Sequence, residues 1–352
     1  MSFFIPLGKR IRRKIRRIYM GDFINNAPFA LVIVFLIIGF VLLIKGADFF
    51  VEGSSSVAKR LHVPSIIIGL TIVAMGTSLP ETAVSVSASI TGNNELAVSN
   101  VVGSNIFNLM VVIGVCAMIA TVNVAKETIK RDIPFSLICA GLLLILGILG
   151  VGDKSGMMLG HFDGVIFIGA FAGYIFYMIK IALKASKEGK KIEIEGGSDE
   201  DIKLISVPLS ILFIIGGAAA IAVGGDITVD AASRIASDLG MSQTLIGLTI
   251  VSIGTSLPEL VTSVTAARRG NAGIAIGNIV GSNIFNILFV IGTTALICTV
   301  PFESKFIIDT VIAVLCGVIL WIGTFRHKEL RKPCGVVMLL CYVAYFLYLC
   351  LV

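Results

Sequence analysis

The sequence GTSLPE occurs twice in the chain, as Gly76–Glu81 and as Gly254–Glu259, and both times it interrupts a long apolar stretch. Each copy lies within a longer repeat, because residues 63–114 align without a gap with residues 241–292. Of the 52 aligned positions, 29 are identical. The chain therefore contains two related halves, and each half places a polar motif in a segment that is otherwise apolar.

A second motif follows the first in each repeat, as SNVVGSNIFN at Ser99–Asn108 and as GNIVGSNIFN at Gly277–Asn286. The GTSLPE copies also place one carboxylate each, Glu81 and Glu259, inside an apolar stretch. A charged side chain is costly at bilayer depth and marks a functional site by default. Two acids at matched positions therefore predict one shared site between the halves.

The composition is that of a membrane protein. Hydrophobic residues make up 56% of the chain and charged residues only 14%, whereas soluble proteins carry about 25% charged residues. Several apolar stretches reach the roughly 20 residues that a helix needs to cross a bilayer. We predict an all-α polytopic membrane protein with ten transmembrane helices. The predicted spans cover residues 28–50, 64–90, 95–121, 133–150, 162–183, 204–224, 243–267, 273–299, 306–324 and 334–352, with the first and sixth open to extension.

The basic residues sort by side of the membrane. Loops after spans 1, 3, 5, 7 and 9 hold 17 of them, and loops after spans 2, 4, 6 and 8 hold 3. The positive-inside rule places the first group in the cytoplasm. The segment KRIRRKIRR at Lys9–Arg17 falls on the opposite side. Three explanations stay open: the native chain starts at Met20, the tail is a peripheral helix on anionic lipid headgroups, or the orientation is reversed.

The repeat also organises the domains. Equivalent points are 178 residues and five spans apart, so the second copy crosses the membrane in the opposite sense. Two inverted five-helix repeats are typical of secondary transporters, which bind substrate near the midplane. We divide the chain into a basic N-terminal tail (1–27), a first five-helix half (28–183), a short cytoplasmic hinge loop (184–203) and a second five-helix half (204–352).

Proline predicts a helix break inside each GTSLPE motif. Pro80 and Pro258 lack an N–H and crowd the preceding turn, so the carbonyls of Gly76 and Gly254 lose their usual partners. Such breaks are tolerated at membrane depth where the backbone lines a cavity. The freed carbonyls are hard oxygen ligands.

The side chains around the breaks have the chemistry of a hard-cation site. Thr77 and Glu81 are spaced i, i+4 on a helix, as are Ser104 and Asn108 in the next span. Carboxylate, hydroxyl, amide and carbonyl oxygens suit Ca²⁺ or Na⁺, and not zinc or copper. Two carboxylates balance one divalent ion. The second half supplies the equivalent residues Thr255, Ser256, Glu259, Ser282 and Asn286.

With these motifs the chain resembles the Na⁺/Ca²⁺ exchanger family of the cation/Ca²⁺ antiporter superfamily, in its prokaryotic type without a regulatory domain. The two copies are similar to the family's α-1 and α-2 repeats. The resemblance implies a core of spans 2, 3, 7 and 8. The other helices, especially spans 1 and 6, would slide across this core to give alternating access.

The resemblance also assigns residues. It implies Ca²⁺ coordination by Thr77, Glu81, Thr255 and Glu259, the threonines through their carbonyls. It implies Na⁺ ligands or site lining at Ala74, Ser78, Ser104, Asn108, Ser252, Ser256, Ser282 and Asn286. Asn286 stands where K⁺-dependent members carry aspartate, so the resemblance implies K⁺-independent exchange. No resident cofactor is expected, because Ca²⁺ and Na⁺ are the transported substrates.

Two other functions remain open on the sequence. An H⁺/Ca²⁺ antiporter of the same superfamily is the nearest, although its motifs usually lack the LP of TSLPE. A cation channel with an acidic filter is more remote, because broken helices in inverted repeats are typical of carriers. No enzyme motif such as HExxH or GxSxG is present. We expect a multi-pass protein of a prokaryotic inner membrane that contacts lipid and binds no nucleic acid.

Overall fold

The computed structural model describes residues 23–24, 26–91, 94–150, 157–188, 204–240 and 252–351. Nearly all of these residues are helical, as predicted. Eight helices are long and apolar enough to span a membrane, and a bent pair makes a ninth if it counts as one span. The seventh predicted span, 243–267, begins outside the described residues, as do most of the N-terminal tail and the hinge loop. The count of ten spans and the domain boundaries therefore stay predictions.

The helices of the first half follow the predicted spans. They are α3 (Phe29–Leu61), α4 (Ser65–Ile68), η1 (Gly69–Val73), α5 (Ala74–Thr77), α6 (Leu79–Thr91), α7 (Glu95–Phe107), η2 (Asn108–Val112), α8 (Ile113–Ile119), η3 (Thr128–Asp132), α9 (Ile133–Leu149) and α10 (His161–Glu188). The first span extends well beyond its predicted end, as the open boundary allowed.

The second half repeats this pattern where it is described. Its helices are α11 (Val207–Asp238), α13 (Ser252–Thr255), α14 (Leu257–Arg268), α15 (Ala272–Phe285), η6 (Asn286–Ile291), α16 (Gly292–Ile297), α17 (Ser304–His327) and α18 (Lys332–Leu351). The π-helical segments η2 and η6 begin at equivalent asparagines, Asn108 and Asn286. Short π-helical segments inside α-helices occur frequently at functional sites.

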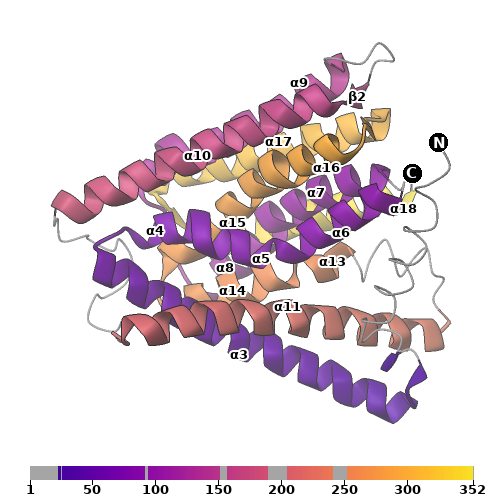
Figure 1. Cartoon of the computed structure of the whole chain (residues 1–352), viewed down its shortest axis with the longest axis horizontal. Coiled ribbons are helices and arrows are strands. Elements are labelled where there is room, and N and C mark those ends of the chain that lie inside the picture. The colour runs from indigo at the N-terminus through magenta and orange to yellow at the C-terminus, as the bar shows by residue number, and fades with distance from the viewer. Residues whose placement is uncertain are drawn as a thin grey trace, which may run out of the picture.

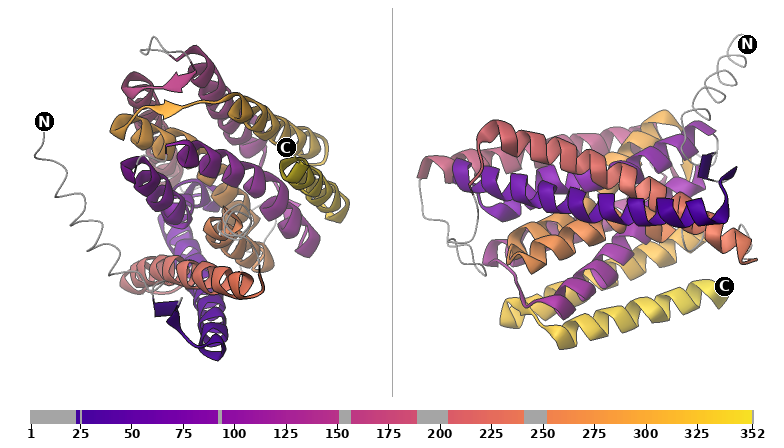
Figure 2. Two further views of the ribbon diagram at one scale, coloured as in Figure 1. Left: turned by 90° about the vertical axis from the view of Figure 1, so that its right-hand side faces the viewer. Right: turned by 90° about the horizontal axis from the view of Figure 1, so that it is seen from below.

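Two long helices form a layer of their own. Helices α3 and α11 lie side by side along one face of the molecule (Figures 1 and 2), and each packs against the other more than against any other element. Glycines allow this close approach. A Cβ added to Gly217 would lie 2.7 Å from the carbonyl oxygen of Gly46, and one added to Gly224 would lie 2.8 Å from that of Gly39. These pairs are seven residues apart on both helices, so one continuous seam joins them.

The most deeply buried span runs through α15, η6 and α16, where 94% of the apolar window is buried. Helix α15 packs against η1, α4 and α14. A Cβ on Gly277 would lie 2.9 Å from the Cα of Gly69. This contact brings the second motif of the second half against the broken span of the first half.

Within the described ranges, four two-residue strands join loops at the ends of the helices, and the sequence did not predict them. Strand β1 (Val122–Asn123) pairs antiparallel with β4 (Glu329–Leu330), and β2 (Met158–Leu159) pairs antiparallel with β3 (Val300–Pro301). Two residues are too few to show the alternation that identifies a strand.

Candidate ion-binding site

The predicted helix breaks occur inside both GTSLPE motifs. Ser78 separates α5 from α6, with φ −86° and ψ 12°, and the helices on either side bend by 44°. Ser256 separates α13 from α14, with φ −92° and ψ 4°. Proline stands two residues after each break, at Pro80 and Pro258, in the first turn of the new helix where its missing N–H is tolerated. The predicted breaks are therefore confirmed. Each glutamate lies in the first turn of the helix that follows the break, and its side chain is buried.

The two carboxylates are fully buried, each with 0% of its surface exposed. Glu81 Oε1 accepts hydrogen bonds from the hydroxyls of Ser104 at 3.4 Å and Ser256 at 3.3 Å. The equivalent bonds to Glu259 Oε1 come from Ser78 at 2.8 Å and Ser282 at 3.4 Å. Each glutamate is thus held by one serine from its own half and one from the other half.

Four oxygens at the site have no hydrogen-bond donor within the described part of the chain. They are Glu81 Oε2, Glu259 Oε2, Asn108 Oδ1 and Asn286 Oδ1. Buried polar atoms are almost always paired, so an orphaned set at matched positions requires an explanation. All four are hard oxygens, and two belong to carboxylates. This set fits a divalent cation such as Ca²⁺, which binds through oxygen and would compensate the two negative charges.

Both threonine hydroxyls point to asparagines of the opposite half. Thr77 Oγ1 donates to Asn278 Oδ1 at 2.9 Å, and Thr255 Oγ1 donates to Asn100 Oδ1 at 3.4 Å. Each hydroxyl thus links its own broken helix to the second motif of the other half. This arrangement is compatible with the prediction that the threonines coordinate cations through their main-chain carbonyls.

Asn100 and Asn278 are residues that the sequence reasoning missed. Asn100 Nδ2 lies 3.4 Å from the main-chain oxygen of Glu81 and 3.1 Å from Ser85 Oγ. The equivalent Asn278 lies 3.4 Å from the oxygen of Glu259 and 2.9 Å from Ser263 Oγ. A signal was available, because all four of these asparagines and serines are identical between the repeats.

Two predicted positions remain, Ala74 and Ser252. The carbonyl oxygen of Ala74 accepts the Ser78 N–H at 3.0 Å, and the Thr77 and Ser282 hydroxyls lie 3.3 and 3.5 Å from it. It therefore lies at the site but already has donors. Ser252 begins α13, and its side chain lies outside the described residues. The structure otherwise brings the predicted set together from α5, α6, α7, η2, α13, α14, α15 and η6.

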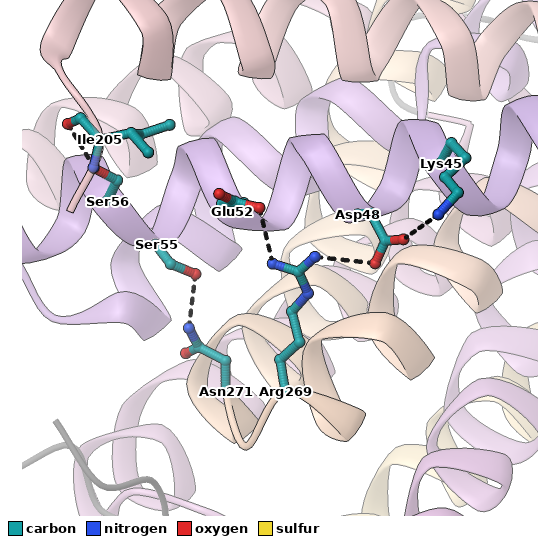
Figure 3. A network of polar contacts seen from close by, with 8 residues as sticks. All are labelled: Lys45, Asp48, Glu52, Ser55, Ser56, Ile205, Arg269 and Asn271. Atoms are coloured by element: carbon teal, nitrogen blue, oxygen red, sulfur yellow. Dashed lines mark hydrogen bonds and ion pairs between the residues drawn. The ribbon is translucent and has the colours of Figure 1, made fainter. Parts of the chain in front are cut away.

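A separate polar network connects α3 to the loop after α14 (Figure 3). Arg269 forms ion pairs with Asp48 at 3.0 Å and Glu52 at 3.4 Å, while Asn271 donates to Ser55 Oγ at 2.8 Å. The ion pairs of Arg269 lie at the surface, because Arg269 is 38% exposed, whereas the bond between Asn271 and Ser55 is buried. None of these residues belongs to the carboxylate site. It is one of the polar links between the α3–α11 layer and the rest of the molecule.

Membrane-length helices, together with two broken helices around a buried pair of carboxylates, define an integral multi-pass membrane transporter. The family model described as "Sodium/calcium exchanger protein" matches residues 31–180 and 209–351. The chain belongs to the sodium/calcium exchanger protein family, and it is a transporter of the cation exchanger class.

Relatives and solved structures agree with this family. The sodium/calcium exchanger MaX1 of Methanosarcina acetivorans is 32% identical over 348 residues, which covers 89% of this chain and 97% of that protein. The inner membrane protein YrbG of Escherichia coli is 32% identical and covers 74% of this chain and 78% of its own length. A structure of the sodium-calcium exchanger NCX_Mj soaked with Na⁺ and Sr²⁺ superposes with a TM-score of 0.77. It is 29% identical and covers 91% of this chain and 99% of that one.

Proposed function

We propose that this protein is a K⁺-independent antiporter that exchanges Na⁺ for Ca²⁺ by alternating access, in the inner membrane of a prokaryote. The carrying observation is the set of four unpaired buried oxygens, Glu81 Oε2, Glu259 Oε2, Asn108 Oδ1 and Asn286 Oδ1. The names of the relatives called sodium/calcium exchangers support the choice of the two ions, and YrbG, named an inner membrane protein, supports the choice of the membrane.

Shared ligands explain why the two ions would be exchanged. The carboxylates and the serines Ser78, Ser104, Ser256 and Ser282 form one hydrogen-bonded cluster. Ca²⁺ and several Na⁺ would draw on the same oxygens, so the site would hold one load or the other. If only the loaded forms change sides, movement of Na⁺ in one direction drives Ca²⁺ in the other.

The architecture offers a way to change sides. The α3–α11 layer is held together by a glycine seam, and it covers the broken helices of the core. Sliding of this layer as one body would open the site to one side of the membrane and then to the other. The core could stay rigid, because its ligands are linked across the two halves.

Independence of K⁺ rests on Asn286. The site contains two carboxylates among the described residues, and Asn286 contributes a neutral oxygen where an aspartate would add a third charge. A site with two negative charges is balanced by one Ca²⁺ alone. A third carboxylate would favour an additional monovalent cation.

The test is ⁴⁵Ca²⁺ uptake into proteoliposomes that contain the purified protein, with one imposed gradient at a time. An outward Na⁺ gradient, with the pH gradient collapsed by an ionophore, should drive uptake at the same rate with or without K⁺. Uptake that follows a pH gradient and ignores Na⁺ would instead show an H⁺/Ca²⁺ antiporter. Uptake that needs no counter-ion gradient would show a channel, and a K⁺ requirement would refute the assignment of Asn286.

A further inference from the structure

Four asparagines form a hydrogen-bonded chain between the two halves, in the order Asn286, Asn105, Asn283 and Asn108. Asn105 and Asn108 come from α7 and η2, and Asn283 and Asn286 come from α15 and η6. All four are buried. Asn105 Nδ2 donates to the main-chain oxygen of Asn283, and Asn283 Nδ2 donates to that of Asn105, each at 3.3 Å. Asn286 Nδ2 donates to Asn105 Oδ1, and Asn108 Nδ2 donates to Asn283 Oδ1, each at 3.2 Å.

This asparagine chain permits one orientation of every amide. A main-chain carbonyl can only accept, so the groups facing the oxygens of Asn105 and Asn283 must be the Nδ2 amines. The Oδ1 atoms of Asn105 and Asn283 then face the amides of Asn286 and Asn108. Because an oxygen accepts, those amides must donate through Nδ2. The side-chain oxygens of Asn108 and Asn286 are thereby turned away from Asn283 and Asn105, and these are two of the four unpaired oxygens of the site.

We propose that Asn105 and Asn283 are positioning residues that orient the cation-facing amides of the opposite half. Asn105 of the first repeat orients Asn286 of the second, and Asn283 of the second repeat orients Asn108 of the first. We call this arrangement crossed control. The proposal rests on the proposed function, because it assumes that the two free amide oxygens face the transported cation. It gives a role to two asparagines that touch neither carboxylate in the described hydrogen-bond network.

Asn105 is also linked to the Glu81 carboxylate, through Asn286 and Ser104. The Nδ2 atom of Asn286 also lies 3.3 Å from Ser104 Oγ, and Ser104 in turn donates to Glu81 Oε1. A rotated Asn286 amide would place its oxygen against Ser104 and its amine toward the cation. The same rotation would thus remove a ligand and add a positive dipole at the site.

The structure also shows how to remove this control without removing the residue's volume. Asn105 and Asn283 line a cavity of about 20 Å³, together with Ser136 and apolar side chains of α9 and α17. Leucine branches at Cγ as asparagine does but is larger, and the cavity lies beside it, so Asn105→Leu would leave no void and would lose both side-chain hydrogen bonds. Asn283 would keep its orientation, because its Nδ2 binds the main chain of residue 105, which the substitution leaves in place.

Two double-mutant cycles test the crossed control by equilibrium ⁴⁵Ca²⁺ binding to the purified, detergent-solubilised protein. Asn105→Leu should weaken Ca²⁺ binding by about tenfold, the order of one lost hydrogen bond. Asn105→Leu combined with Asn286→Ala should bind no more weakly than Asn286→Ala alone, because Asn105 acts only through Asn286. Asn105→Leu combined with Asn108→Ala should multiply the two single effects, since coupling is expected only between groups that share an interaction.

Other results would overturn the proposal. One is a double variant Asn105→Leu, Asn286→Ala in which the two losses of Ca²⁺ affinity multiply. A second is coupling between Asn105→Leu and Asn108→Ala, which lie in the same half. A third is wild-type Ca²⁺ affinity in Asn105→Leu. The mirror cycle with Asn283→Leu and Asn108→Ala serves if Asn105→Leu does not fold. The binding assay uses no Na⁺ gradient, so crossed coupling without Na⁺-driven flux would refute only the proposed function. Na⁺-driven flux without crossed coupling would refute only this inference.

Discussion

Replacement of Glu81 by glutamine tests the site most directly, because it removes one negative charge and keeps the shape of the side chain. In the structure Oε1 accepts from Ser104 and Ser256, whereas Oε2 has no donor among the described residues. The glutamine carbonyl would take over the position of Oε1. Its amine would then occupy the position of Oε2 and direct two hydrogens to where a cation is expected.

The size of the effect follows from the burial of this carboxylate. Two unit charges 4 Å apart interact by about 4 kcal/mol at an effective dielectric constant of about 20. Ca²⁺ carries two charges, so this value is a lower limit for the loss, and it corresponds to about a thousandfold weaker binding. The free energy of unfolding should not fall in the absence of Ca²⁺, because the substitution removes one of two buried, uncompensated charges.

Two measurements separate these effects. Na⁺-driven ⁴⁵Ca²⁺ uptake should be abolished in Glu81→Gln, and Ca²⁺ should no longer raise its thermal unfolding temperature as it does for the wild type. Glu259→Gln should behave in the same way. Glu95→Gln is the matched control, because that carboxylate is 46% exposed and pairs with Lys305. Near-normal uptake in Glu81→Gln or Glu259→Gln would refute the assignment of the site.

Three further predictions follow from other parts of the structure. Asn286→Ala should lower Na⁺-driven uptake without creating a K⁺ requirement, as measured with and without K⁺ on both sides of the vesicle. Gly277→Ala should lower stability by about 1–3 kcal/mol, because its Cβ would lie 2.6 Å from a main-chain oxygen of α4. Gly169→Ala, which meets nothing within 4 Å in the described structure, should not lower it in thermal unfolding. Arg269→Gln should cost less than about 1 kcal/mol, since its ion pairs are exposed, and added salt should reduce the difference.

Local chemistry made the helix breaks predictable. Proline at positions 80 and 258 removes a donor whatever the rest of the fold does, and the breaks lie at Ser78 and Ser256 as the motif requires. The membrane-length helices were predictable for a similar reason, because hydropathy and length determine which segments can span a bilayer. Both features depend on residues that are neighbours in the sequence.

Partners across the two halves were not predictable from spacing. Helical spacing places Ser104 and Asn108 on one face, but it gives no indication that Asn108 would bond to Asn283. The role of Asn278 depends on the approach of α15 to the broken first-half span, where Gly277 lies against Gly69. That approach is a tertiary contact. The repeat alignment could have marked Asn278, since it is identical to its counterpart, but not the group it binds.

The reciprocal bonds explain why the two copies agree in polar residues as well as in apolar pattern. Ser256 binds the carboxylate of the first half and Ser78 binds that of the second, so each glutamate takes one of its two serine donors from the other half. The threonine–asparagine bonds and the asparagine chain cross between the halves in the same way. A change of one polar residue therefore disturbs the ligand of the other copy. Duplication retained only for packing would leave these side chains free to differ, whereas a single site built jointly by both halves requires them to match.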